Sequence, residues 1–182
     1  HAIVATGSSP AMPEIFDIND ARIMDSTSAL ELREIPQSML IVGGGIIGME
    51  LGQVYAALGS SVSVVEMMPG LIPPADRDLV KPLEDHLKSQ FENIWTNTKV
   101  TGISATEEVI SVEFEAPNSH TFNQTFPSIL VSVGRYPNSS DIGIENTDIE
   151  LDDRGFIKVD AQMRTSESSI FAIGDVIGAG LA

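Results

Sequence analysis

The clearest hydrophobic pattern in the chain is an apolar run, a glycine-rich turn, a segment of helical length and a second apolar run. The first run, Met39–Val42, has the length of a buried strand, and a helix is expected from Ile46 to about Leu58. The second run alternates β-branched residues over Val62–Val65 and ends at Glu66. This order predicts a β-α-β unit, whose two strands are parallel.

Three later segments alternate apolar and polar residues with a period of two, and polar turns separate them. They are Thr98–Thr106, Val109–Ala116 and Thr121–Phe126. Their succession predicts an antiparallel meander. The apolar run that follows, Ile129–Val133, ends at Gly134 and is typical of a buried strand that returns to a parallel sheet. We therefore expect the meander to be an insert between parallel strands.

Two helices and a linker complete the expected elements. A short helix is expected over Thr27–Arg33, after a polar, proline-containing stretch that ends at Asp25 and is expected to be a linker. A longer helix is expected to begin near Asp76, a residue type suited to the N-cap. Pro82 lies inside its pattern and is expected to kink the helix or to set a later start. The apolar residues at helical spacing in this segment are Leu79, Val80, Leu83 and Leu87.

The glycine-rich turn between the first strand and the helix indicates a nucleotide site. Gly43 allows a sharp turn, Gly45 lets backbone N–H groups approach a pyrophosphate, and Gly48 lets the helix press against the strand. The phosphates would lie at the N-terminus of the helix, where unpaired N–H groups and the helix dipole favour an anion. The residues of this predicted site are Gly43, Gly44, Gly45, Ile46, Ile47 and Gly48.

The residue at the end of the second strand indicates which dinucleotide is bound. Glu66 follows Gly48 by eighteen residues, and its carboxylate would accept hydrogen bonds from both hydroxyls of the adenosine ribose. A 2′-phosphate there would meet a like charge, and the next residues, Met67 and Met68, provide no cation to receive it. The expected cofactor is therefore NAD rather than NADP.

Composition narrows the classes of function. The chain has 26 acidic and 10 basic residues and a formal charge of -16, which argues against a nucleic-acid surface. No apolar stretch approaches the ~20 residues that span a bilayer, so no membrane segment is expected. The absence of cysteine excludes thiol chemistry within these residues and agrees with a cytoplasmic location. Because a strand-like run begins at His1 without an initiator Met, we expect a piece of a longer protein.

Further segments give the chain a resemblance to a known family. Besides the glycine turn, they are Ala5–Ser8, Val133–Asn138 and Ile170–Val176. Together they resemble the flavoprotein disulfide reductases, which contain two dinucleotide-binding folds. Within that family, the bacterial dihydrolipoamide dehydrogenases look most similar over Asp25–Leu32, Gly43–Leu51 and Asp153–Ile157. The resemblance covers essentially the whole chain.

The resemblance implies roles for residues outside the turn. Val100 would lie beside the adenine of NAD, Gly134 near the nicotinamide, and Ile47 in the nicotinamide pocket, although simple helix packing explains an isoleucine there equally well. Glu50 would lie near the flavin, where the family pairs it with a lysine that this chain lacks; a surface position is its alternative. The implied FAD site consists of Thr6, Gly7, Ser8, Gly174 and Asp175.

The expected fold is α/β, a Rossmann-like NAD-binding domain with a parallel sheet, a β-α-β dinucleotide unit and an antiparallel three-stranded insert. By the resemblance, residues 1–12 would be the last strand and link of a preceding FAD domain, 13–145 the NAD-binding domain, and 146–182 the return into the FAD domain. The family's redox-active disulfide and acid–base pair would lie outside this chain. No catalytic residue and no metal ligand is therefore expected here, and His1, His86 and His120 are expected to carry no chemistry.

The resemblance also implies an activity for the parent protein. Such enzymes oxidise protein-bound dihydrolipoamide through a disulfide and FAD, with hydride transfer to NAD. The implied partners are the lipoyl domain of an acyltransferase component and a second subunit in a homodimer. The piece itself is expected to be monomeric and inactive, and to bind FAD weakly or not at all.

Two alternatives stay open at this point. One is another FAD-dependent pyridine nucleotide oxidoreductase, such as soluble transhydrogenase or an NADH-peroxide or mercuric reductase. The other is a non-catalytic module that binds NAD. The second leaves Thr6, Gly7 and Asp175 without an evident use.

Overall fold

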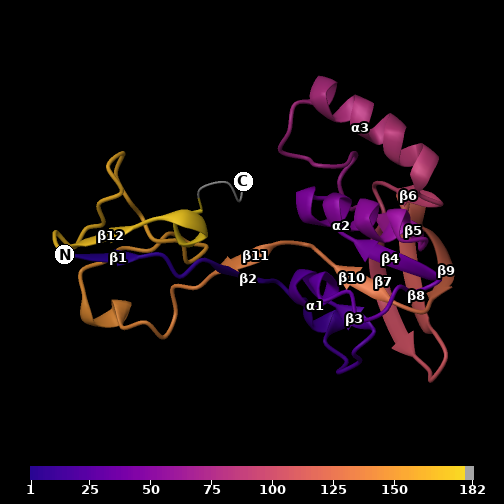
Figure 1. Cartoon of the computed structure of the whole chain (residues 1–182), viewed down its shortest axis with the longest axis horizontal. Coiled ribbons are helices and arrows are strands. Elements are labelled where there is room, and N and C mark those ends of the chain that lie inside the picture. The colour runs from indigo at the N-terminus through magenta and orange to yellow at the C-terminus, as the bar shows by residue number, and fades with distance from the viewer. Residues whose placement is uncertain (179–182) are drawn as a thin grey trace. The chain divides into compact units, whose positions relative to one another are not determined.

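The computed structural model describes residues 1–178, so the last four residues of the predicted return segment 146–182 lie outside the described part. By their contacts the residues form two compact units (Figure 1). One unit is Ala11–Gly134, and the other joins His1–Pro10 to the chain from Arg135 onward. Residues 135–145 thus pack with the flanking segments and not with the rest of the expected domain 13–145.

A five-stranded sheet forms the centre of the unit Ala11–Gly134. Its strand order is β3-β10-β4-β5-β6, and every neighbouring pair is parallel. The strands are β3 (Ile23–Met24), β10 (Ile129–Val131), β4 (Ser38–Val42), β5 (Ser61–Val65) and β6 (Asn93–Trp95). The α-helices are α1 (Ser26–Leu30), α2 (Ile46–Ala57) and α3 (Arg77–Gln90). The predicted parallel sheet and its β-α-β unit, β4-α2-β5, are confirmed.

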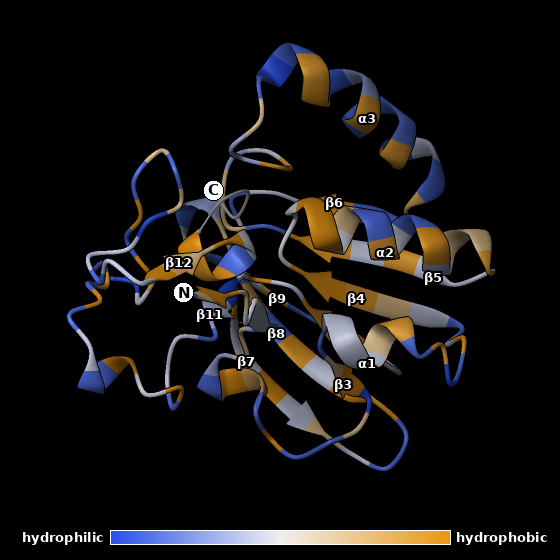
Figure 2. Ribbon diagram, turned by 60° about the vertical axis from the view of Figure 1, so that its left-hand side comes forward, coloured by the Kyte–Doolittle hydropathy of each residue, from blue (hydrophilic) through white to orange (hydrophobic). Residues whose placement is uncertain are grey.

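Successive side chains of β4 enter two different core layers. Met39 and Ile41 pack with residues of α1, α2 and α3, whereas Leu40 and Val42 pack on the other face with residues of the meander. All four are at most 7% exposed. Because the strand is covered on both faces, its sequence is continuously apolar and does not alternate. Along α3, hydrophobic and hydrophilic bands alternate in Figure 2, as in a helix with one buried face.

The antiparallel meander predicted from the alternating segments is confirmed. It consists of β7 (Lys99–Ala105), β8 (Ile110–Ala116) and β9 (His120–Phe126), paired in that order. The ring of Phe114, which is fully buried, stacks on Phe122 at 4.8 Å and lies 5.2 Å from Trp95 of β6. These aromatic contacts fix the meander against the edge of the parallel sheet.

Some local predictions were wrong. The expected linker before Asp25 contains β3, an edge strand paired with β10. The short helix ends at Leu30 and not at Arg33. The long helix begins at Arg77, which agrees with the start expected near Asp76, but Pro82 lies inside it and does not set a later start. Asp76 occupies the N-cap position, but its side chain makes no capping hydrogen bond.

The other unit consists of two pairs of short strands and a small core. Strand β1 (Ala2–Val4) pairs in parallel with β12 (Ile170–Ala172), and β2 (Ser8–Pro10) pairs antiparallel with β11 (Arg135–Pro137). Its core cluster consists of Ile144, Ile157, Ala172 and Val176. The two ends of the chain therefore pack together as strands. Among the helices of residues 1–178, none combines the length and apolar character needed to cross a bilayer.

Candidate functional site: a glycine turn and a buried glutamate

The turn between β4 and α2 and the first turn of α2 leave no room for side chains at two glycines, Gly43 and Gly48. Gly43 has a φ of +103°, and a Cβ added there would lie 2.5 Å from the carbonyl oxygen of Ser132. A Cβ added to Gly48 would lie 2.3 Å from the carbonyl oxygen of Gly43 and 2.6 Å from the hydroxyl of Ser132. These contacts explain why both positions need glycine, as the pattern predicted.

Gly45 faces open space and begins the helix. No atom lies within 4 Å of the position that its Cβ would occupy. It is the N-cap of α2, and the first hydrogen bond of the helix runs from the Met49 N–H to the Gly45 carbonyl at 3.0 Å. The N–H groups of Ile46, Ile47 and Gly48 precede that bond and have no acceptor within the helix. Open space beside them suits a bound pyrophosphate.

The carboxylate of Glu66 is bonded to the glycine turn. Its Oε2 accepts the N–H of Gly44 at 2.7 Å, and its Oε1 accepts the N–H of Met68 at 2.7 Å. The residue is 9% exposed. Each carboxylate oxygen can accept a second hydrogen bond, so this group can also receive hydroxyl donors. The carboxylate that the sequence analysis assigned to the ribose thus lies at the turn.

The loop after β5 packs against the turn, a contact that the sequence did not predict. The N–H of Ile72 donates to the Gly44 carbonyl at 2.8 Å, and Leu71 is 1% exposed. The guanidinium of Arg77 donates to the carbonyls of Leu71, Ile72 and Ala75, at 2.9, 2.6 and 2.9 Å. Arg77 therefore holds the loop that supports the turn. Arg77 stands eleven positions after Glu66 and belongs to no recognised motif, so only its contacts in the folded chain reveal this role.

The remaining predicted NAD residues differ in their surroundings. Ile46 is 53% exposed at the start of α2, while Ile47 is partly buried and packs against the core on its side of the sheet. Glu50 is exposed. Val100 packs with the core of the meander, and the carbonyl of Gly134 accepts the N–H of Ala11 at 2.9 Å. Among the described residues, the hydrogen bonds bring Glu66 to the turn but bring neither Val100 nor Gly134 there.

The predicted FAD residues come together in the unit formed by the two ends of the chain. Ser8 Oγ donates to Asp175 Oδ2 at 2.7 Å. Thr6 Oγ1 donates to the carbonyl of Asn138 at 2.6 Å, and Gly7 accepts the N–H of the same residue at 2.9 Å. Gly174 has a φ of +78° and opens the short 3-10 helix Gly174–Ile177 that carries Asp175. Segments more than 160 residues apart in sequence thus form one cluster.

Arg135 belongs to the same cluster, although it was not among the predicted residues. Its Nε donates to Ser8 Oγ at 2.6 Å, and its Nη2 donates to the Ser8 carbonyl at 2.7 Å. The same Nε lies 3.9 Å from Asp175 Oδ2. The signal for it was a cation directly after Gly134 in the segment Val133–Asn138. The ion pair compensates the charge of the Asp175 carboxylate.

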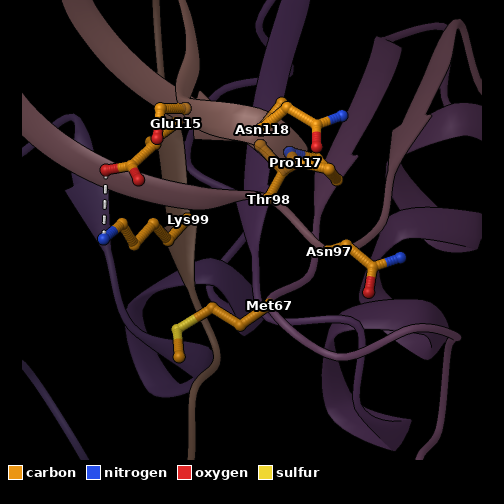
Figure 3. A pocket seen from close by; sticks show the side chains of 9 residues that line it. Met67, Asn97, Thr98, Lys99, Glu115, Pro117 and Asn118 are labelled. Atoms are coloured by element: carbon orange, nitrogen blue, oxygen red, sulfur yellow. Dashed lines mark ion pairs between the residues drawn. The ribbon is translucent and has the colours of Figure 1, made fainter.

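Residues 43–48 do not line either of two prominent cavities of the unit Ala11–Gly134. One has a volume of about 380 Å³ and includes Met67, the residue directly after Glu66 (Figure 3). The other, of about 370 Å³, lies between α3 and β6. The lining of the first is Met67, Asn97, Thr98, Lys99, Glu115, Ala116, Pro117, Asn118 and Ser119.

The fold and the site together define a class. A parallel sheet whose β-α turn is closed by glycines, with a buried glutamate at the end of the neighbouring strand, is the architecture of a dinucleotide-binding α/β protein. Comparison with protein families gives the particular group. Residues 1–182 match the model described as pyridine nucleotide-disulphide oxidoreductase, and the chain belongs to that family.

Individual relatives agree with this assignment. The chain is 47% identical over 178 residues to dihydrolipoyl dehydrogenase of Vibrio parahaemolyticus and 44% identical over 178 residues to that of Haemophilus influenzae. Each alignment covers 98% of this chain and 37% of the relative. The structure of the HOCl-induced flavoprotein disulfide reductase RclA from Escherichia coli matches with a TM-score of 0.84 and 31% identity, over 97% of this chain and 40% of that one. The resemblance stated from the sequence is confirmed, and the chain spans well under half the length of these relatives.

Proposed function

We propose that the unit Ala11–Gly134 binds NAD(H) within a dihydrolipoyl dehydrogenase. The observation that carries the proposal is the Glu66 carboxylate, which is buried at the end of β5 and bonded to the Gly44 N–H of the glycine turn. An acidic group in this position recognises the ribose of NAD. The similarity to proteins named dihydrolipoyl dehydrogenase supports the same conclusion.

The residues present fit the parts of the cofactor. The open space at Gly45 and the N–H groups that follow it suit the pyrophosphate, while Glu66 suits the adenosine ribose. We propose Val100 for the adenine end, with Ile47 and Gly134 for the nicotinamide end. Glu50 is proposed as a neighbour of the flavin.

We also propose that the chain contributes to the FAD site of its parent. The residues proposed for it are Thr6, Gly7, Ser8, Gly174 and Asp175. The Asp175 carboxylate accepts a hydrogen bond from Ser8 and can accept more from ribityl hydroxyls. Bound FAD and NAD would supply the electron and hydride transfer, and the part of this chain would be to bind and orient them.

The proposal for the parent protein follows from its relatives. It would oxidise dihydrolipoamide carried on the lipoyl domain of an acyltransferase component, as a homodimer in the cytoplasm. The 182-residue chain would bind NAD(H) as a monomer without catalysing this reaction. Its FAD affinity would be low, because a complete FAD site would need further residues of the parent.

Calorimetric titration with NADH and NADPH tests the proposed cofactor. The wild-type chain is expected to bind NADH saturably and NADPH much more weakly. Because the discriminating carboxylate is removed in Glu66→Ala, that variant is expected to lose the preference. Absence of binding by either nucleotide to the folded wild-type chain would contradict the assignment.

A further inference from the structure

The cavity beside Glu66 contains an ion pair. Lys99 and Glu115 are opposite each other on β7 and β8, and Lys99 Nζ lies 3.1 Å from Glu115 Oε2. Figure 3 shows the pair at the cavity that Met67 also lines. Of the nine residues that line this cavity, Lys99 is the one cation. The positive charge of Lys99 is therefore compensated by the carboxylate of Glu115 within the same cavity.

Backbone hydrogen bonds tie this cavity to the proposed ribose site. The N–H of Thr98 donates to the carbonyl of Glu66 at 3.0 Å, and the N–H of Asn97 donates to the carbonyl of Met68 at 3.0 Å. Lys99 is the next residue after Thr98. The main-chain hydrogen bond of Thr98 therefore holds the backbone of Lys99 close to Glu66. Lys99 also lines the same cavity as Met67, the residue directly after Glu66.

The charge balance of this cavity bears on the choice between NAD and NADP. NADP carries a 2′-phosphate on the adenosine ribose, which is the group that Glu66 would contact. A free lysine nearby would attract that phosphate and oppose the repulsion from Glu66. A lysine paired at 3.1 Å has its charge compensated and offers much less attraction.

We propose that Glu115 is a second determinant of the preference for NAD over NADP, acting through its ion pair with Lys99. Glu66 repels the 2′-phosphate, and Glu115 neutralises the cation that would otherwise compensate for that repulsion. The inference rests on the proposed function, because it presupposes that the ribose lies at Glu66. It adds a residue of the meander to the determinants of cofactor choice.

The test compares NADH and NADPH affinities of the full 182-residue chain at low salt, for the wild type and for Glu115→Gln. The substitution keeps the size of the side chain and frees Lys99. The pair is partly exposed, with side chains 52% and 35% accessible, so its loss affects stability little. NADPH is expected to bind about 3- to 10-fold more tightly, with the NADH affinity unchanged. The gain is expected to shrink at high salt.

Two further variants isolate the role of the pair. The double variant Glu115→Gln/Lys99→Gln is expected to lose the gain in NADPH affinity, because no cation is left. Glu150→Gln makes the same change of net charge at another lysine–glutamate pair, Lys158–Glu150, whose atoms are 3.5 Å apart. This control is expected to leave both affinities unchanged.

The outcomes separate the inference from the proposed function. If the wild type binds NADH and Glu115→Gln leaves the ratio of the two affinities unchanged, the inference is overturned. An equal gain in Glu150→Gln also overturns it, since net charge would then be the cause. If the wild type binds neither nucleotide, the proposed function fails and the inference fails with it. Should Glu115→Gln not fold, Lys99→Gln alone is expected to weaken NADPH relative to NADH, and an unchanged ratio would overturn the inference.

Discussion

Gly45, the N-cap of α2, and Gly48, in its first turn, differ in what an added methyl group would meet, and this difference separates an effect on folding from an effect on binding. A Cβ at Gly48 would lie 2.3 Å from a backbone oxygen, which cannot move without shifting β4. Gly48→Ala is therefore expected to lower the free energy of unfolding by about 1–3 kcal/mol, the usual cost of overpacking. Denaturant unfolding of the variant and of the wild type measures this difference in the free energy of unfolding. A variant as stable as the wild type would contradict the tight packing of α2 on β4.

Gly45→Ala is the matched control for that variant. No atom lies within 4 Å of the added methyl, and the φ of -75° is ordinary for alanine. Stability is expected to stay close to that of the wild type, while NADH binding weakens because the methyl occupies the space proposed for the pyrophosphate. The pair of variants thus distinguishes a structural glycine from one that serves the ligand.

At the scale of elements, the loop after β5 is expected to control how well the turn is formed. Arg77→Gln removes the hydrogen bonds from the guanidinium to three carbonyls of this loop. Without them the loop is held less firmly in the position from which the Ile72 N–H donates to the Gly44 carbonyl. We expect faster amide exchange at Ile72 and about 3- to 10-fold weaker NADH binding, the equivalent of losing roughly one hydrogen bond.

Arg22→Gln provides the control for the loop. Arg22 also donates to backbone carbonyls, those of Thr106 and Glu107, but these belong to the turn between β7 and β8. Its loss is expected to leave NADH affinity unchanged. If both arginine variants weaken NADH equally, the loop has no specific role in supporting the glycine turn.

The turn before β3 is expected to respond to pH. Hydrogen bonds from the Arg22 side chain, followed by its backbone N–H, hold the pKa of Asp20 below its usual value. A lowered pKa in the folded state stabilises the protein above the ordinary pKa of about 3.9, and this stabilisation is lost as the pH falls through the folded value. The difference in unfolding free energy between the wild type and Asp20→Asn is expected to be constant above about pH 5 and to shrink towards pH 3. A difference that is independent of pH would contradict this.

How far an element could be predicted depended on its length and on the range of its contacts. Strand β4 was recognised as a continuous apolar run, and helix α2 and the meander strands were long enough for their residue patterns to be recognised. Strands β3 and β6 have two and three residues, too few to show a period, and they form because β10 and β5, their neighbours in the sheet, offer them hydrogen bonds. The later start considered for α3 was wrong because the helix tolerates a missing N–H at Pro82 once its buried residues Val80 and Leu87 are packed.

The same reasoning applies to the site. The glycines and Glu66 follow from residue types at fixed spacing, so the sequence predicted them. Arg77, Arg135 and the Lys99–Glu115 pair act through segments that are brought together only in the folded chain. Nothing local in the sequence marks Arg77 or the Lys99–Glu115 pair, and the one local sign for Arg135 is its place directly after Gly134. The register of β7 on β8 pairs Lys99 with Glu115, and the pairing of β2 with β11 brings Arg135 to Ser8.

For the whole molecule, the division into two units predicts that NADH binding is independent of the flanking segments. All strands of the five-stranded sheet and of the meander come from Ala11–Gly134, and the strands β1, β2, β11 and β12 pair only among themselves. The glycine turn, Glu66, Arg77 and the Lys99–Glu115 pair likewise lie within this unit. Removing the flanks therefore exposes no edge of the sheet that holds the site.

The excised segment 11–134 is accordingly expected to unfold in one cooperative transition and to bind NADH within about 3-fold of the full chain, since distant parts contribute nearly additively. Calorimetric titration and thermal unfolding of both chains test this. Glu66→Ala in the excised segment controls for specific binding. An affinity loss of more than about tenfold would show that the flanking segments support the proposed NAD site.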